Sequence, residues 1–128
     1  MFERAERALT RVEGLRVHVV VDAPARMERT MTLDRTALPL ARLHPAQWVE
    51  HPRRFACGHG FECARGDLDV EAAARELKPL LPPLPVKPSA LGPAKIEVRL
   101  DSRGDLHRID VVGKAFGANV ELTLQPVR

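Results

Sequence analysis

The residues best suited to chemistry in this chain are Cys57 and Cys63, which flank a glycine-rich segment that contains His59. A short hairpin around that segment would let the cysteines form a disulfide, which would stabilise the fold by about 2 kcal/mol and indicate an oxidising compartment. The two could also be free thiols. A metal site is a third interpretation, because an extended run places both cysteines and His59 on one face, with His51 as a further candidate ligand. Since the spacing C-x-H-x3-C differs from the paired C-x2-C of structural zinc sites, we favour the disulfide and expect no metal.

The remaining polar residues do not form a catalytic pattern. Tyrosine is absent and serine occurs only at Ser89 and Ser102, which leaves few groups for nucleophilic or acid–base catalysis. The segment 58–60 lacks the third glycine and the strand-to-helix setting of a phosphate-binding loop, so it predicts a turn. His107 falls on the apolar face of its predicted strand, where a hydrogen-bonded core or rim histidine is expected. We therefore expect no enzyme activity and no cofactor.

Composition narrows the classes of partner. The chain has 128 residues, 45% hydrophobic and 29% charged, which predicts a single globular domain over residues 1–128. The net charge is only +3 and aromatic residues make up 4%, so we expect no nucleic-acid partner. No apolar stretch approaches the roughly 18 residues of a membrane span, and the charged opening segment is not typical of a secretory signal.

The elements that must position these residues follow from hydrophobic periodicity in the first half of the chain. An amphipathic helix is predicted over residues 2–13, and alternation predicts strands over 15–22 and 26–33 that pair as a hairpin. Residues 34–54 are harder to assign, with an edge strand around Pro39 and a short helical turn from Pro45 as the expected elements.

The second half has clearer signals. A helix is predicted after Asp67 or Asp69, either of which can cap it. Residues 79–93 carry six prolines and predict a stiff, extended connection that lies against the domain. Within residues 94–125, three alternating runs predict an antiparallel meander with one polar face.

The fold class predicted from these elements is α+β, with a curved antiparallel sheet whose one face is wet and whose other face is covered by two helices. An apolar sheet face can be a filled core or, where the sheet curves away from its helices, can leave a ligand cavity. The candidate residues that would line such a cavity are Val17, Val19, Val21, Leu77, Leu80, Leu81, Ile96, Val98, Leu100, Val120, Leu122 and Leu124.

Two segments resemble the LppX/LprG family of bacterial lipoproteins. Residues 65–126, RGDLDVEAAARELKPLLPPLPVKPSALGPAKIEVRLDSRGDLHRIDVVGKAFGANVELTLQP, are similar to the closing half of that family. There a strand leads into a helix, a proline-containing link, a strand, a D-x-x-G turn and two further strands. The opening ERALTRVEGLRVHVVVDAP resembles the family's start, a helix before a strand of the V-H-V-x-V type. Family members are longer and carry more strands where this chain has residues 26–64.

The resemblance implies a half-barrel of the LolA type, covered on its concave face by an N-terminal and a central helix. Proteins of this kind hold acyl chains of lipids or lipoproteins between sheet and helices, outside the cytoplasmic membrane. We therefore expect a non-enzymatic carrier of a lipid or acylated ligand in the cell envelope, on the periplasmic or extracellular side. Another envelope protein or lipoprotein would be its partner, and any membrane attachment would use an anchor absent from this chain.

The alternative is a small protein-interaction module with a filled core and no ligand. Its contact surface would be the exposed edge near residues 36–43 together with the loop around Trp48.

Overall fold

One open antiparallel sheet of seven strands organises the protein, in the order β2-β1-β7-β6-β5-β4-β3. The computed structural model describes residues 1–22, 26–34, 43–78, 92–115 and 118–127. In chain order its elements are α1 (Phe2–Leu9), β1 (Gly14–Val21), β2 (Met27–Asp34), the 3₁₀ turn η2 (Pro45–Gln47), β3 (Val49–Phe55), β4 (Phe61–Leu68), α2 (Val70–Leu77), β5 (Lys95–Asp101), β6 (Leu106–Ala115) and β7 (Ala118–Pro126).

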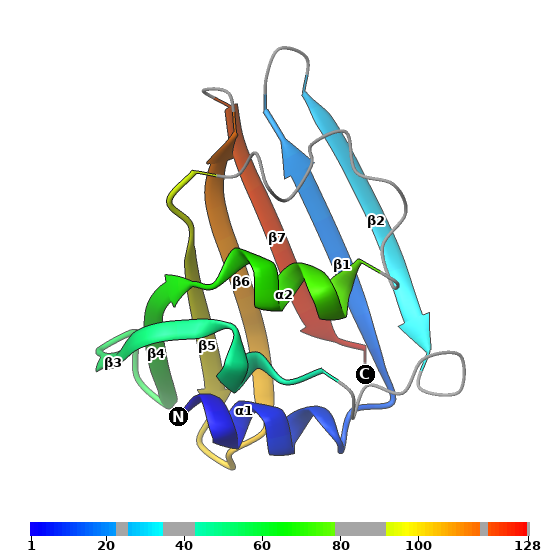
Figure 1. Ribbon diagram of the computed structural model, residues 1–128. Helices are drawn as coiled ribbons and strands as arrows, with labels where there is room; N and C mark the ends of the chain where they lie inside the picture. The colour runs from blue at the N-terminus through cyan, green and yellow to red at the C-terminus, as the bar shows by residue number, and fades with distance from the viewer. Residues whose placement is uncertain (23–25, 35–42, 79–91, 116–117, 128) are drawn as a thin grey trace.

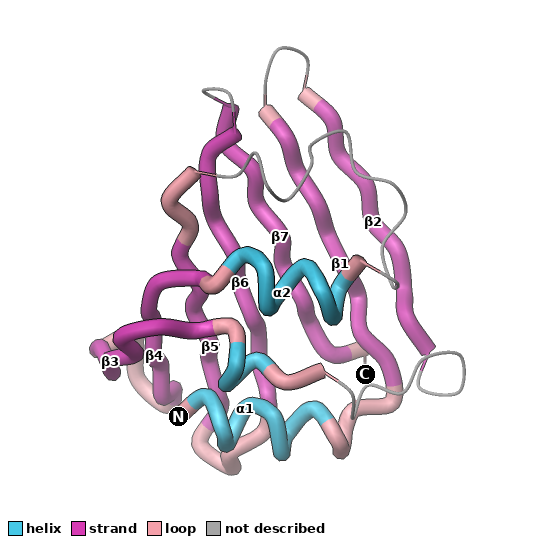
Figure 2. Tube along the Cα trace, in the orientation of Figure 1, coloured by secondary structure: helices cyan, strands magenta, loops and turns pink. Residues whose placement is uncertain are grey.

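Both helices and the η2 turn lie against the same face of the sheet (Figures 1 and 2). We call this the inner face. α1 runs along one end of the sheet, and α2 crosses the middle of the face on its way toward β1 (Figure 1). The α+β prediction is confirmed as a seven-stranded antiparallel sheet with two helices, and that sheet is neither closed nor strongly curled.

Strict alternation gives β1 and β7 one apolar face each, and both lie inside the sheet, away from its edges. In β1, the buried residues Leu15, Val17, Val19 and Val21 point to the inner face, while Arg16 is exposed on the outer face. Cross-strand partners share a face, so the register places β7 leucines directly beside these β1 side chains. The first and last strands of the chain are therefore neighbours.

The orientation predicted for His107 is wrong because the β5–β6 pair contains a β-bulge. The register shifts between the Arg99–Arg108 pair and the Leu100–Leu106 pair, which leaves one extra residue in β6. Leu106 is buried as a result, and the His107 ring lies 4.9 Å from the ring of Phe61. His107 therefore does not occupy the apolar face on which the alternation placed it.

The two helices begin and end for local reasons. At α2 the carboxylate of Asp69 accepts a hydrogen bond from the Ala72 amide at 3.1 Å, so Asp69 is the cap that the sequence proposed beside Asp67. α1 ends earlier than predicted because the chain tightens after Leu9. Amide bonds there reach back three residues, as from Val12 to Leu9 at 3.3 Å.

The core lies between the inner face and the two helices. Trp48 is its largest fully buried side chain, with no exposed surface. Pro45 opens the η2 turn, as predicted, and η2 carries Trp48 to the core. The proline-rich segment 79–91, including Leu80 and Leu81, and the edge strand expected around Pro39 lie outside the described residues.

Candidate apolar ligand site

The inner face is most completely shielded where α1 covers it. The side chains of Val98 and Leu100 in β5 have no exposed surface, and the β1 residue Val17 has none either. Leu124 of β7 joins them at 1% exposure. These residues belong to one continuous hydrophobic cluster with Phe2, Leu9 and Trp48. This end of the face is filled core.

Away from α1, buried residues of the same hydrophobic cluster keep a little solvent contact. Leu122 is 9% exposed and Val19 is 8% exposed, and Val120 is half-buried. On the edge strand β2, Met31 is half-buried and Met27 is 38% exposed. We call the following residues the distal apolar patch: Val19, Val21, Met27, Met31, Val111, Val120 and Leu122.

The structure divides the twelve predicted cavity residues into groups. Those in the shielded core are Val17, Ile96, Val98, Leu100 and Leu124. Those in the distal apolar patch are Val19, Val21, Val120 and Leu122. Leu77 projects from α2 and is buried in the main cluster. Val111, Met27 and Met31 were not among the candidates, although alternation in their strands already placed them on this face.

The cover over this face is fixed by Glu76 of α2. Its Oε1 accepts hydrogen bonds from the Trp48 indole Nε1 at 2.6 Å and from the His44 amide at 2.7 Å. Its Oε2 lies 2.7 Å from His44 Nδ1, in an ion pair when the imidazole is protonated. We call this set the Glu76 latch. It ties α2 to the segment before β3.

Burial alone would raise the pKa of Glu76. The hydrogen bonds from His44 and Trp48 outweigh that effect and leave the pKa below its ordinary value. Glu76 is therefore a carboxylate at neutral pH. A second carboxylate, Glu6 of α1, accepts from the Ala46 amide at 2.9 Å, so the η2 segment is held from both helices.

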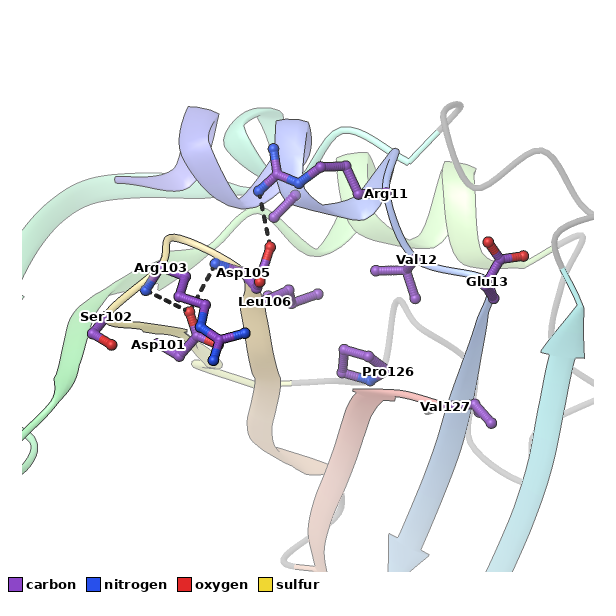
Figure 3. Close-up of a pocket in the computed structure, with 11 residues that line it drawn as sticks. Arg11, Val12, Glu13, Asp101, Ser102, Arg103, Asp105, Leu106, Pro126 and Val127 are labelled. Atoms are coloured by element: carbon purple, nitrogen blue, oxygen red, sulfur yellow. Dashed lines mark hydrogen bonds and ion pairs between the residues drawn. The ribbon is translucent and has the colours of Figure 1, made fainter.

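Figure 3 shows a separate surface pocket of about 490 Å³ beside the last turn of α1. One wall is the β5–β6 turn, where Asp101 accepts from the amides of Arg103 and Asp105. Arg11 closes another side by donating to the Gly104 carbonyl at 3.2 Å and to Asp105 at 3.4 Å. Of the ten predicted cavity residues that the structure describes, none lines this pocket. Arg11 and Asp105 are paired with each other, and Asp101 is occupied by backbone amides.

Comparison with protein-family models, with characterised proteins and with solved structures finds no match to this chain. The site is therefore argued from its own geometry. Among the described residues, no helix is long and apolar enough to cross a membrane. The described residues also contain no cluster of three or more histidine, cysteine or acidic side chains that would hold a metal ion.

Cys57 and Cys63 form a disulfide, which confirms the favoured interpretation of these residues. The bond lies in the β3–β4 hairpin, where Cys63 pairs with Phe55 across the strands. The neighbouring aromatic rings lie under guanidinium groups, with Arg65 4.4 Å from the Phe55 ring centre and Arg99 5.5 Å from that of Phe61. The disulfide thus cross-links the hairpin at one edge of the sheet, away from the distal apolar patch.

Replacing both cysteines by serine will lower the free energy of unfolding by about 2 kcal/mol, because the six-residue separation closes a short loop in the unfolded chain. Urea unfolding followed by Trp48 fluorescence measures this change. Reduction of the native protein is the matched control and should give the same value. A loss that spreads to the whole fold at room temperature would show that the bond does more than restrict the hairpin.

Proposed function

We propose that this protein is a non-enzymatic carrier that binds the acyl chain of a lipid or acylated ligand over the distal apolar patch. The sheet would then act as the wall of a half-barrel, with α1 and α2 covering its concave face. The proposal rests chiefly on the difference in burial across the inner face, from β5 toward β2. Five predicted residues have at most 1% exposed surface, while Val19, Val111 and Leu122 retain 8–9%.

Several features support this interpretation. Apolar surface of this kind binds alkyl chains without any catalytic group, at about 25 cal/mol for each Å² buried. The cover is attached to the rest of the protein by the Glu76 latch and by Leu77, so α2 is held over this face. The disulfide is consistent with an oxidising compartment, which suits the cell envelope. A lipid or another envelope lipoprotein is the proposed partner.

The alternative of an interaction module using the Trp48 loop has less support. The Trp48 side chain has no exposed surface and donates its indole N–H to Glu76. Its ring is therefore part of the core and is not available as a surface contact.

Native mass spectrometry of the purified protein tests the proposed function. A lipid-sized adduct that is lost on denaturation supports a carrier. A protein that is bare, and that also takes up neither fatty acid nor phospholipid when these are added, contradicts it.

A Leu122→Gln variant sharpens that test. We expect it to fold and to bind a fluorescent fatty acid about tenfold or more weakly, because an amide in the apolar site costs roughly 1–3 kcal/mol. Glu121→Gln is the matched control, since Glu121 is the preceding residue and is exposed on the outer face. Equal affinity of the Leu122 variant and the control would place the ligand elsewhere.

A further inference from the structure

A single cation stands on the apolar side of β2. Arg29 pairs with Val19 across the β1–β2 hairpin, and the pairing is regular along all eight residues of the strand. Cross-strand partners share a face, so Arg29 faces the same side as Val19. Alternation along β2 places Met27 and Met31 on either side of it. Arg29 is therefore part of the rim of the distal apolar patch.

The register extends from Arg29 across four further strands. Val19 pairs with Leu122, Leu122 with Val111, and Val111 with Ile96. We call these five residues the Arg29 row: Arg29, Val19, Leu122, Val111 and Ile96. At about 4.8 Å between strands, the row spans roughly 19 Å from β2 to β5. It consists of one cation followed by an uninterrupted line of apolar side chains. This arrangement is complementary to an anionic amphiphile, whose charged headgroup would match the cation and whose alkyl chain would match the apolar side chains.

No hydrogen bond or ion pair joins the Arg29 side chain to another described residue, whereas Glu28 beside it is paired. Glu28, its neighbour on the outer face, lies 2.6 Å from His18 and 3.7 Å from Arg26. The Arg29 side chain is exposed, and no carboxylate or carbonyl oxygen of the described residues lies within bonding distance of it. Its hydrogen-bond donors are thus open to a ligand.

We propose that Arg29 binds the anionic headgroup of the acyl ligand, a carboxylate or a phosphate, while the chain lies over Val19, Leu122 and Val111 of the Arg29 row. The inference rests on the proposed function and narrows its ligand to anionic amphiphiles. A guanidinium stays charged at all accessible pH values and matches both oxyanions with paired N–H donors.

The test compares three ligands of equal chain length: palmitate, palmitoyl lysophosphatidic acid and hexadecanol. Each is titrated into the full chain and into Arg29→Gln, Arg29→Lys and Arg16→Gln, with affinity read by displacement of a fluorescent fatty acid. Arg16 is the matched control, because it is an exposed arginine on the outer face of the neighbouring strand.

We expect Arg29→Gln to bind palmitate or palmitoyl lysophosphatidic acid about tenfold or more weakly, because a charge-assisted hydrogen bond is lost. Hexadecanol should bind unchanged, Arg29→Lys should recover part of the affinity, and Arg16→Gln should match the native protein. A loss confined to palmitate identifies a carboxylate ligand, and a loss confined to the lysophosphatidic acid identifies a phosphate ligand.

Two other outcomes overturn the inference in distinguishable ways. If all three ligands bind and Arg29→Gln weakens none of them, or weakens hexadecanol equally, the carrier function stands and the headgroup role is wrong. Arg29 would then be an inward charge that protects an edge strand from pairing with other chains, and its glutamine variant would self-associate in sedimentation experiments. If none of the three ligands binds the native protein, the proposed function itself fails.

Discussion

Replacing Glu76 by alanine will lower the free energy of unfolding by about 3 kcal/mol at neutral pH. The change removes the acceptor for the buried Trp48 indole N–H and for the His44 amide, and each donor left without a partner costs roughly 1–3 kcal/mol. Urea unfolding measures the loss. Because Trp48 is the only tryptophan in the chain, its fluorescence reports directly on the Glu76 latch.

Two variants control this experiment. Glu76→Gln keeps an acceptor for Trp48 but removes the charge that faces His44, so it should lose less stability than the alanine variant. Glu71→Ala removes a carboxylate from the exposed side of the same helix and should change stability by well under 1 kcal/mol. Equal losses for Glu71→Ala and Glu76→Ala would mean that the latch contributes no more than helix propensity.

The latch also predicts how stability depends on pH. The pKa of Glu76 is lower in the folded protein than its ordinary value. Between these two pKa values, the unfolded chain therefore binds more protons at Glu76 than the folded protein does. The stabilisation is fully present above the ordinary glutamate pKa and is lost as the pH falls through the lowered value. We expect the acid unfolding of Glu76→Gln to lack this part of the pH dependence, as seen in urea midpoints measured between neutral pH and about pH 3.

The second large effect is expected in the shielded core. Val98→Asp will prevent stable folding, because it places a carboxylate where the valine has no exposed surface and packs within the main hydrophobic cluster. An unpaired charge in such a place costs several kcal/mol, which is comparable to the whole stability of a domain of this size.

Val112→Asp is the matched control for that variant. Val112 is 46% exposed in the adjacent strand β6 and pairs with Lys95. Its replacement should change the free energy of unfolding by no more than about 0.5 kcal/mol. Circular dichroism and the urea midpoint compare the two proteins. A folded Val98→Asp protein with near-native stability would show that this end of the inner face is not a filled core.

Much of the fold could be predicted from the sequence because most strands alternate without interruption. β1 and β7 have one apolar face each, and the bounds predicted for β1, residues 15–22, lie within one residue of the observed Gly14–Val21. Local chemistry was equally informative at Pro45, which starts the η2 turn, and at Asp69, which caps α2. These signals depend only on neighbouring residues.

Other features could not be predicted because they depend on contacts between distant residues or on irregular backbone. β3 has no period, since Pro52 interrupts it, His51 has a φ of 54° and the register shifts between Glu50 and Arg53. The Glu76 latch joins side chains about thirty residues apart, and helix periodicity does not reveal such partners. The face on which Arg29 lies, by contrast, was implied by the alternation of Met27 and Met31. Its apolar neighbours in β1, β7, β6 and β5 are known only from the strand register.

The pairing of β1 with β7 has a consequence for the order in which the sheet is assembled. The β1–β2 hairpin contacts the rest of the sheet through β7, the final strand of the chain. Until β7 has formed, the β1 edge opposite β2 has no strand to pair with, and the β1 valines have no leucine partners. Closure of so long a loop is entropically costly and slows folding. During synthesis, the hairpin would therefore leave the ribosome before β7 and join the sheet only once β7 has formed, with its apolar face open throughout that interval.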